Sequence, residues 1–470
     1  MNEIAAKLTS KDFASDQEVR WCPGCGDYSI LKQVQTVLPD LGRPREEFVF
    51  ISGIGCSSRF PYYMDTFGMH SIHGRATAIA TGLKATRPDL SVWIITGDGD
   101  SMSIGGNHFI HLLRRNPDVN VLLFNNQIYG LTKGQYSPTS EQGKVTKSSP
   151  MGSVDYPFNP IALCLGADAT FVARTMDRDP KHQQAIIKRG YDHKGTSLVE
   201  IYQNCNVFND GAYEIYTEKS SKKEETLMME HGKPLIFGEK NDKGIKLDGF
   251  KPVIVSLNDV SVDDLWVHDE TDLVKATIIS RFYDDPGKEN HFPRPFGVFY
   301  VNNNKRTFDD LFNEQITEAK ETKGPGELNQ LLADYYTVIK NISQDIKDAN
   351  KDNNSQLIED TIRNNYVDLL MNKPAENGAP AQIGILDKIR KLRYMYNNVE
   401  YDEDTNKYHL IQKKNTIESL EAPHSDKVIS YVFGVFESKT KTKKTGQKES
   451  KNKTRKLRIE EDSSIEEKTP

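Results

Sequence analysis

The sequence predicts a doubly wound α/β fold with a mostly parallel sheet over residues 18–210. Short β-branched and apolar runs alternate there with stretches whose apolar residues have helical spacing. The apolar runs have no polar face, as expected for strands that helices cover on both sides. In such folds ligands bind beyond the carboxyl ends of the strands, so the residues that follow each strand are candidates for function.

The alternation can be followed element by element. The predicted elements, in order, are the helix Tyr28–Leu38, the strand Phe48–Ile51, the helix Arg75–Thr86, the strand Val92–Ile95, the helix Asn107–Arg115, the strand Val119–Phe124, the helix Pro180–Tyr191 and the strand Leu198–Ile201. Turns rich in Gly, Asp or Ser follow the strands. Residues 246–340 have a mixed pattern, and polar and charged residues become frequent beyond residue 340.

The composition excludes several classes of protein. No apolar run in the 470 residues approaches the roughly 20 residues that span a bilayer, and no signal peptide is visible. A net charge of −6 argues against a basic nucleic-acid binder. Five cysteines are too few for a disulfide scaffold. We therefore expect a cytoplasmic protein, without a membrane partner, whose cysteines bind metal or do chemistry.

Two polar motifs follow neighbouring predicted strands. Gly-Asp-Gly-Asp at 97–100 comes after the strand Val92–Ile95, and Asn-Asn-Gln-Ile-Tyr-Gly at 125–130 comes after the next strand. A Gly-Asp-Gly turn lets the backbone approach a phosphate group. A carboxylate, an amide oxygen and a backbone carbonyl are suitable Mg²⁺ ligands. We expect a magnesium and diphosphate site here; the alternative is two unrelated polar turns.

Four cysteines are expected to converge on the same edge of the sheet. Cys22 and Cys25 form a Cys-x-x-Cys knuckle, while Cys56 and Cys205 each follow a predicted strand. Four thiolates can hold a [4Fe–4S] cluster or a structural zinc ion, and the spacing does not separate these two. A redox-active pair, or a knuckle with two buried thiols, are further alternatives. Cys164 lies in an apolar run and is expected to be an inert buried thiol.

These motifs together resemble the β subunits of 2-oxoacid:ferredoxin oxidoreductases, and most closely the 2-oxoglutarate type. The shared strings, in order, are Trp-Cys-Pro-Gly-Cys-Gly at 21–26, Gly-Ile-Gly-Cys-Ser-Ser-Arg-Phe-Pro-Tyr-Tyr at 53–63, Ile-His-Gly-Arg at 72–75, Gly-Asp-Gly-Asp at 97–100, Asn-Asn-Gln-Ile-Tyr-Gly-Leu-Thr-Lys-Gly-Gln at 125–135, Asn-Cys-Asn at 204–206, His-Asp-Glu at 268–270, Phe-Pro-Arg-Pro-Phe-Gly-Val at 292–298 and Lys-Gly-Pro-Gly-Glu-Leu at 323–328. The resemblance covers residues 10–340 and does not extend to 341–470.

The resemblance implies the thiamine diphosphate-binding fold, thiamine diphosphate held through Mg²⁺, and one [4Fe–4S] cluster. The implied Mg²⁺ ligands are Asp98, Asn126 and the carbonyl of Ile128. The implied contacts to the organic cofactor are His73, Gly97, Gly99 and Asp100, and the implied cluster ligands are Cys22, Cys25, Cys56 and Cys205. In such an enzyme electrons from the decarboxylation of a 2-oxo acid pass through the cluster to ferredoxin, and coenzyme A takes the acyl group.

Three further residues are implied at the substrate. Arg59, three residues after Cys56, resembles a clamp for the distal carboxylate of a dicarboxylic 2-oxo acid, because a guanidinium can pair a carboxylate bidentately. The alternative is a surface or subunit-contact arginine. Leu131 and Lys133 follow the metal motif and are expected to line the substrate or coenzyme A pocket, although Leu131 is equally consistent with ordinary packing.

The family obtains the glutamate that activates the thiamine ring from a separate α subunit. No second α/β half of that kind is readable here, so we expect a heteromer and a chain that is inactive alone. Two alternatives stay open at this point. One is the same class of enzyme acting on pyruvate or branched-chain 2-oxo acids. The other is a non-catalytic scaffold that an iron–sulfur cluster or zinc holds together.

The chain is expected to have four parts. They are a thiamine diphosphate- and iron–sulfur-binding α/β domain (1–245), the C-terminal part of the family β subunit (246–340), a helical extension of unknown role (341–438) and a charged tail (439–470). Helical patterns cover Ile358–Met371 and Ile385–Asn397 of the extension. The basic run Lys439–Arg458 has almost no apolar residue and cannot bury enough surface to fold alone, and RNA or an acidic ferredoxin are alternative partners for it.

Overall fold

The structure is a computed structural model that describes residues 8–283, 291–324, 326, 399–402 and 407–410. The chain divides into two compact units, Met1–Pro325 and Gly326–Pro470. In the second unit the described residues form one antiparallel pair of strands, β12 (Val399–Asp402) and β13 (Lys407–Leu410). The two predicted helices of the extension and the basic run lie outside the described residues.

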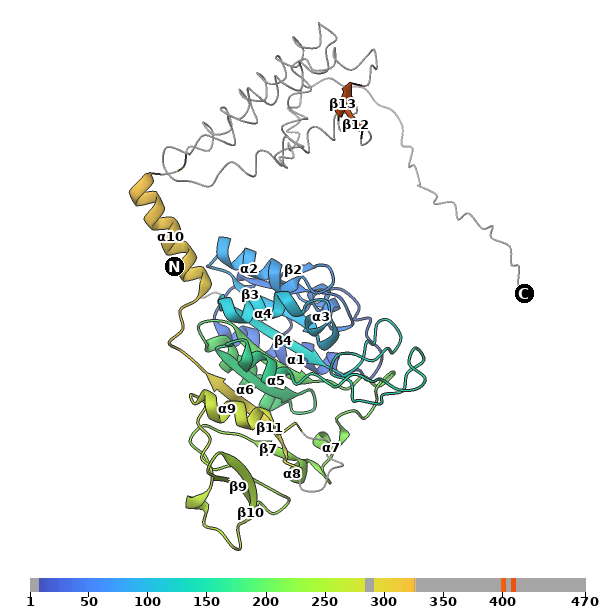
Figure 1. Ribbon diagram of the computed structural model, residues 1–470, viewed down its shortest axis with the longest axis vertical. Helices are drawn as coiled ribbons and strands as arrows, with labels where there is room; N and C mark the ends of the chain where they lie inside the picture. Colours follow the sequence, from blue (N-terminus) through green and yellow to red (C-terminus); the bar gives the residue numbers. More distant parts are fainter. Residues whose placement is uncertain (1–7, 284–290, 325, 327–398, 403–406, 411–470) are drawn as a thin grey trace, which may run out of the picture. The chain divides into compact units, whose positions relative to one another are not determined.

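An eight-stranded sheet lies at the centre of the first unit (Figure 1). Its strands stand in the order β2-β1-β3-β4-β6-β5-β11-β7, and all neighbours are parallel except β11 and β5. The strands are β1 (Phe48–Ser52), β2 (Phe67–His70), β3 (Ser91–Gly97), β4 (Val119–Asn125), β5 (Phe171–Met176), β6 (Ser197–Tyr202), β7 (Thr226–Met228) and β11 (Arg294–Val301). The prediction of a mostly parallel sheet is confirmed.

Helices cover both faces of this sheet. Successive side chains of a strand point to opposite faces, so each strand contributes to a core on either side. In β3, Val92 and Ile94 belong to one hydrophobic core, whereas Trp93 and Ile95 belong to the other. Residues of α2, α4, α5 and α9 fill the first core, and residues of α1 and α6 fill the second. These helices are α1 (Asp27–Val37), α2 (Ala76–Thr86), α4 (Gly106–Arg115), α5 (Pro160–Gly166), α6 (Pro180–Asp192) and α9 (Leu273–Ser280).

Smaller elements complete the first unit. A three-stranded antiparallel sheet has the order β10-β9-β8, with β8 (Ile236–Phe237), β9 (Lys243–Asp248) and β10 (Lys251–Ser256). The remaining α-helices are α3 (Asp98–Met102), α7 (Glu214–Thr217), α8 (Lys222–Glu225) and α10 (Phe308–Lys323), and 3₁₀ turns cover Leu38–Leu41, Arg45–Glu47, Ser57–Tyr63 and Val262–Asp264. In the part of the chain that the structure describes, none of the helices has the length and apolar character needed to cross a membrane.

The eight elements predicted from the sequence are all present, and their ends differ by at most two residues from the observed ones. Four strands of the main sheet escaped prediction: β2, β5, β7, and β11 in the mixed region 246–340. Strand β11 lies between β5 and β7, so the chain returns to the main sheet after forming the small one.

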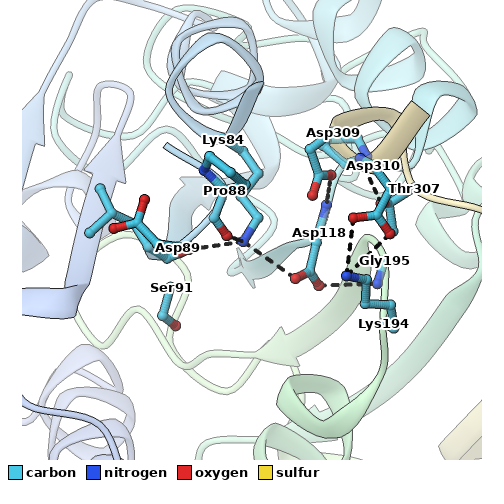
Figure 2. Close-up of polar contacts among 12 residues, drawn as sticks. Lys84, Pro88, Asp89, Ser91, Asp118, Lys194, Gly195, Thr307, Asp309 and Asp310 are labelled. Carbon is cyan, nitrogen blue, oxygen red and sulfur yellow. Dashed lines mark hydrogen bonds and ion pairs between the residues drawn. The ribbon is translucent and has the colours of Figure 1, made fainter. Parts of the chain in front are cut away.

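A polar network at the amino end of β4 fastens the last described helix of this unit (Figure 2). Asp118, which directly precedes β4, donates its N–H to Asp309 Oδ1 at 2.9 Å. Its Oδ2 lies 3.3 Å from Nζ of the buried Lys84, which also donates to the carbonyls of Pro88 and Leu90. Helix α10 therefore starts against the sheet, with Thr307 Oγ1 as its N-cap.

Candidate functional site

The two motifs that the sequence places after neighbouring strands meet in the structure. Strands β3 and β4 pair in parallel, with Gly97 opposite Phe124. Asp98, the first residue after β3, and Asn125, the last residue of β4, therefore lie side by side at this edge of the sheet. Asp98 begins α3, and the chain after Asn125 turns through Gln127, whose φ is +55°. The predicted neighbourhood of the two motifs is confirmed by this register.

Asp98 is buried and has one hydroxyl partner at short range. Thr139 Oγ1 donates to its Oδ2 at 2.6 Å, and the same hydroxyl lies 2.9 Å from Asn125 Oδ1. Burial raises the pKa of the Asp98 carboxyl to about 6, although hydrogen bonds from Ser137 and Thr139 act in the opposite direction. A carboxylate in this position is short of compensating positive charge, which a bound cation would supply.

The backbone after Asn125 offers a free carbonyl at the expected place. The carbonyl of Asn126 accepts from Asn209 Nδ2 at 2.9 Å, that of Gln127 from Ser140 Oγ at 2.6 Å, and that of Tyr129 from the N–H of Gly134 at 2.9 Å. Among the described residues, no donor reaches the carbonyl of Ile128. This oxygen, the Asp98 carboxylate and the Asn126 amide oxygen are hard donors of the kind that Mg²⁺ takes.

Asn126 itself is held at both ends of its side chain. Its Nδ2 donates to Gln203 Oε1 at 2.8 Å, and its Oδ1 accepts from the N–H of Ile128 at 3.2 Å. The amide oxygen therefore lies on the side of the metal motif. The two hydrogen bonds fix the orientation of this side-chain amide.

The carboxylate of Asp100 accepts hydrogen bonds from other groups of the chain. Oδ1 accepts from the N–H groups of Ile54 and Gly74, at 3.1 and 2.7 Å, and Oδ2 accepts from Thr96 Oγ1 at 3.1 Å. A Cβ on Gly53 would lie 1.9 Å from Oδ2, so only glycine fits there. Asp100 thus joins three segments near the site, and its contact with a cofactor stays a prediction.

The other implied cofactor contacts lie nearby. Gly97 ends β3, and Gly99 packs so closely on Tyr129 that an added Cβ would lie 2.1 Å from its ring. His73 is exposed and precedes Gly74, which has a φ of +63°. His73, Gly97, Gly99 and Asp100 thus all lie near the carboxyl end of β3. Their individual roles stay predictions.

Hydrogen bonds tie the three cysteine-bearing segments together. The N–H of Gly26 donates to the carbonyl of Asn204 at 3.1 Å, and Asn206 Nδ2 donates to the carbonyl of Pro23 at 2.6 Å. The indole N–H of Trp21 donates to the carbonyl of Cys56 at 2.7 Å. The Cys-x-x-Cys knuckle, Cys56 and Cys205 therefore form one region, as the sequence predicts.

This cysteine region borders the metal motif. A Cβ added to Gly130 would lie 3.3 Å from Cys56 Sγ and 3.6 Å from Cys205 Sγ. Asn209 joins the two regions, since its N–H donates to the carbonyl of Cys205 while its side chain holds the carbonyl of Asn126. The two candidate centres are thus neighbours at the carboxyl ends of β4 and β6.

Two thiols of this region, those of Cys25 and Cys56, stay protonated without a cation. Burial raises the pKa of Cys25 well above its usual range and that of Cys56 to about 12, and nearby Asp27 and cysteines act in the same direction. All five cysteines are free thiols, and Cys164 is fully buried. In the described ranges no three His, Cys, Asp or Glu side chains surround a point that a single metal ion could occupy. A [4Fe–4S] cluster binds each cysteine at a different iron, so its ligands need not surround one point.

A cavity of about 440 Å³ opens beside Cys56. Arg59, Leu131, His70 and Arg20 are among its lining residues, so two of the three implied substrate residues share it. Arg20 is paired with Glu18 at 2.8 Å, whereas the guanidinium of Arg59 has no hydrogen bond or ion pair within the described residues. Lys133 is exposed and does not line the cavity.

Sequence reasoning missed three residues of this site: Thr139, Gln203 and Asn209. Each acts through a hydrogen bond to a residue that a motif does identify. Thr139 comes from a loop that folds back, and no spacing rule predicts its partner. Gln203 and Asn209 lie close to Cys205 in the sequence. This proximity to a predicted ligand is the signal that could have identified them.

Known proteins are similar to this chain in sequence. The family model described as "Thiamine pyrophosphate enzyme, C-terminal TPP binding domain" matches residues 53–201. The 2-oxoglutarate oxidoreductase subunit KorB of Mycobacterium tuberculosis is 52% identical over 326 residues, which cover 68% of this chain and 86% of that protein. The 2-oxoglutarate synthase subunit KorB of Archaeoglobus fulgidus is 42% identical over 185 residues, covering 39% of this chain and 69% of that protein.

A solved structure is also similar to this chain. It is a 2-oxoglutarate:ferredoxin oxidoreductase from Magnetococcus marinus with 2-oxoglutarate, coenzyme A and succinyl-CoA bound. The two structures share a TM-score of 0.54 and 32% sequence identity, over 70% of this chain and 97% of that chain. The chain therefore belongs to the β subunits of the 2-oxoacid:ferredoxin oxidoreductases, and it is an oxidoreductase subunit that works with other subunits.

Proposed function

We propose that this chain is the β subunit of a cytoplasmic 2-oxoglutarate:ferredoxin oxidoreductase. The enzyme would oxidatively decarboxylate 2-oxoglutarate and release CO₂ and an acyl-CoA, with ferredoxin as the electron acceptor. The observation that carries the proposal is that a metal motif borders a region of four cysteines, and that this motif contains a carbonyl that no donor of the described residues reaches. The similarity to two KorB subunits of 2-oxoglutarate enzymes supports the choice of substrate.

Thiamine diphosphate would be held through Mg²⁺ by Asp98, Asn126 and the carbonyl of Ile128. The fit rests on the buried carboxyl of Asp98, whose pKa is raised to about 6, and on the carbonyl of Ile128, which lacks a donor among the described residues. When bound, thiamine diphosphate supplies an electron sink for the carbon that loses CO₂. The chain's part is to neutralise and hold the diphosphate through Mg²⁺, with Thr139 keeping the Asp98 carboxylate in place.

A [4Fe–4S] cluster would be held by Cys22, Cys25, Cys56 and Cys205. These four thiols come from three segments that hydrogen bonds join to one another. Such a set suits a group that needs one thiolate per iron. The border between this region and the metal motif supports direct electron transfer from the cofactor site. Cys22 is exposed, so the region is open to solvent on one side, where a ferredoxin has access.

Arg59 would bind the distal carboxylate of 2-oxoglutarate. Its guanidinium lacks a partner within the described residues and lines a cavity that also contains Leu131, so a charged and an apolar wall are available to a dicarboxylic acid with a methylene chain. A bidentate pair with a carboxylate would satisfy the guanidinium. Lys133, exposed beyond the cavity, stays a candidate contact for coenzyme A.

A separate α subunit would complete the active site, so the chain alone is expected to be inactive. The test is viologen reduction by the chain with and without its co-expressed α subunit, using 2-oxoglutarate, pyruvate and branched-chain 2-oxo acids in parallel. We expect turnover from the pair only, fastest with 2-oxoglutarate and dependent on thiamine diphosphate. Full turnover by the single chain, or a preference for pyruvate, would refute the corresponding part of the proposal.

A further inference from the structure

Gln203 contacts one predicted ligand of each centre through the two atoms of its amide. It follows β6, two residues before Cys205, and is 1% exposed. Its Oε1 accepts from Asn126 Nδ2 at 2.8 Å, and its Nε2 donates to Cys25 Sγ at 3.3 Å. One buried side chain therefore bridges the metal motif and the cysteine region.

The surrounding hydrogen bonds determine which way this amide points. Nε2 also donates to the backbone carbonyl of Asn204, which can only accept, so the nitrogen must lie on that side. The oxygen must then face Asn126, and Asn126 has to present its nitrogen to it. The amide oxygen of Asn126 is left on the opposite side, next to Ile128. Gln203 thus sets the orientation of the side chain that is expected to bind Mg²⁺.

The same amide acts on the cysteine region through its N–H group. A hydrogen bond to a cluster thiolate stabilises the more negative, reduced state of the cluster and makes its potential less negative. Gln203 is buried and Cys25 is half-buried, so water competes with this contact less than it would at an exposed thiol.

We propose that Gln203 is a positioning residue shared by the two centres: it aims the Asn126 oxygen at Mg²⁺ and tunes the cluster through its N–H···S bond to Cys25. This inference rests on the proposed function, because it assumes that both cofactors bind as described. Its consequence is that a single substitution at residue 203 changes the affinity of one centre and the potential of the other.

The test uses Gln203→Met in the complete enzyme, assembled with its α subunit and purified anaerobically. Methionine keeps the length and approximate volume of the side chain but cannot form either hydrogen bond. Two quantities are measured: the dissociation constant of thiamine diphosphate with Mg²⁺, and the midpoint potential of the cluster in a redox titration followed by electron paramagnetic resonance. We expect about 10–100-fold weaker cofactor binding, as is usual when a ligand's own partner is removed, and a more negative potential.

Gln183→Met is a matched control. Gln183 lies in α6, is fully buried, and has no hydrogen-bond partner for its amide within the described residues. The control is expected to leave both quantities unchanged, because it removes a buried amide without touching either centre. If Gln203→Met does not assemble, Gln203→Asn decides, since its amide is one methylene too short to reach both partners and both readouts should again move.

The inference is overturned if either readout of an assembled Gln203 variant stays at the wild-type value, or if the control moves both as far. A failure of the proposed function is recognised separately. It is seen in the wild-type complex, as the absence of a cluster signal or of turnover that depends on thiamine diphosphate.

Discussion

Strand β4 carries a network of polar side chains at each end, and the two networks differ in how far protein groups satisfy them. At the amino end, the buried Lys84 ammonium is surrounded by two carbonyls and a carboxylate, and Asp118 uses both carboxylate oxygens and its N–H. At the carboxyl end, burial raises the pKa of Asp98 to about 6 and the carbonyl of Ile128 lacks a donor among the described residues.

The difference separates a structural network from a binding site. Both ends bring together carboxylates, amides and hydroxyls, so residue types alone do not distinguish them. The two ends differ in whether an acceptor is left without a donor: among the described residues, a cation could reach the carbonyl of Ile128 without displacing a hydrogen-bond donor from it. At the amino end the same cation would have to break bonds that hold α10 to the sheet.

Substitution of Asp98 should have the largest effect, and it should impair only the network at the carboxyl end of β4. Asp98→Asn removes the negative charge but keeps the shape, and we expect more than about 100-fold weaker binding of thiamine diphosphate with Mg²⁺, because even a ligand's outer partners contribute 10–100-fold. The melting temperature of the cofactor-free protein should not fall. A carboxyl whose folded pKa is raised destabilises the folded state at neutral pH, so removing its charge costs no stability.

Asp118→Asn is the control for that experiment at the other end of the strand. It should lower the melting temperature, since Asp118 pairs with Lys84, and should leave cofactor binding unchanged. Equal effects of the two variants on cofactor affinity would contradict the distinction between the two ends.

Arg59→Leu should have the next largest effect. We expect kcat/KM for 2-oxoglutarate to fall by about 10–100-fold, the value of a hydrogen bond to a charged group, while kcat/KM for pyruvate changes by less than about threefold. Steady-state viologen reduction with both substrates measures this. Arg20→Leu is the matched control, because Arg20 lines the same cavity but is already paired with Glu18. Equal losses on both substrates would rule out the carboxylate clamp.

Lys84→Met should affect stability and not function. It leaves the carbonyls of Pro88 and Leu90 without their donor, so the free energy of unfolding should fall by about 1–3 kcal/mol. Urea denaturation measures this change, and a cofactor titration of the folded variant serves as the check on function. Loss of cofactor affinity in a variant that is fully folded would show that the amino end also belongs to the site.

The smallest effect expected is a change in how stability depends on pH. Burial lowers the pKa values of His193 and His268, so both are neutral in the folded protein and take up protons more readily when it unfolds. The two histidines therefore contribute a loss of stability as the pH drops below about 6.5, the ordinary histidine value, whereas the raised pKa of the buried Asp98 carboxyl contributes a gain. Urea denaturation of the wild type and of His193→Gln at pH 7.5 and 5.5 separates the two contributions, and the change on acidification should be more favourable in the variant. An equal pH dependence in the two proteins would contradict this assignment.

The sequence was sufficient for elements whose pattern is local. β3 and β4 are continuous apolar runs, and the motifs after them located Asp98, Asn126 and Ile128 correctly at one edge of the sheet. Strand β5 escaped because Arg174 interrupts its apolar run; that charge is buried only because Glu200 on β6 pairs with it at 2.7 Å. Strand β2 escaped because it is an exposed edge strand with no buried face.

The contacts of the site were less predictable than its ligands. Thr139 and Gln203 act through partners that are distant in sequence, and the fold alone brings them together. Neither the hydrophobic periodicity of the sequence nor the spacing of its motifs indicates such a contact. The same holds for the carbonyl of Ile128: within the described ranges, donors reach the neighbouring carbonyls but not this one, and that follows only from the folded structure.

At the carboxyl ends of β4 and β6 we expect a thiamine centre and an iron–sulfur centre side by side. The most direct test is electron paramagnetic resonance of the anaerobically purified complex with its α subunit, before and after the addition of 2-oxoglutarate. We expect the signal of a reduced [4Fe–4S] cluster that appears only when substrate, Mg²⁺ and thiamine diphosphate are all present. A complex without an iron–sulfur signal, or a cluster that 2-oxoglutarate reduces equally well in the absence of thiamine diphosphate, would contradict it.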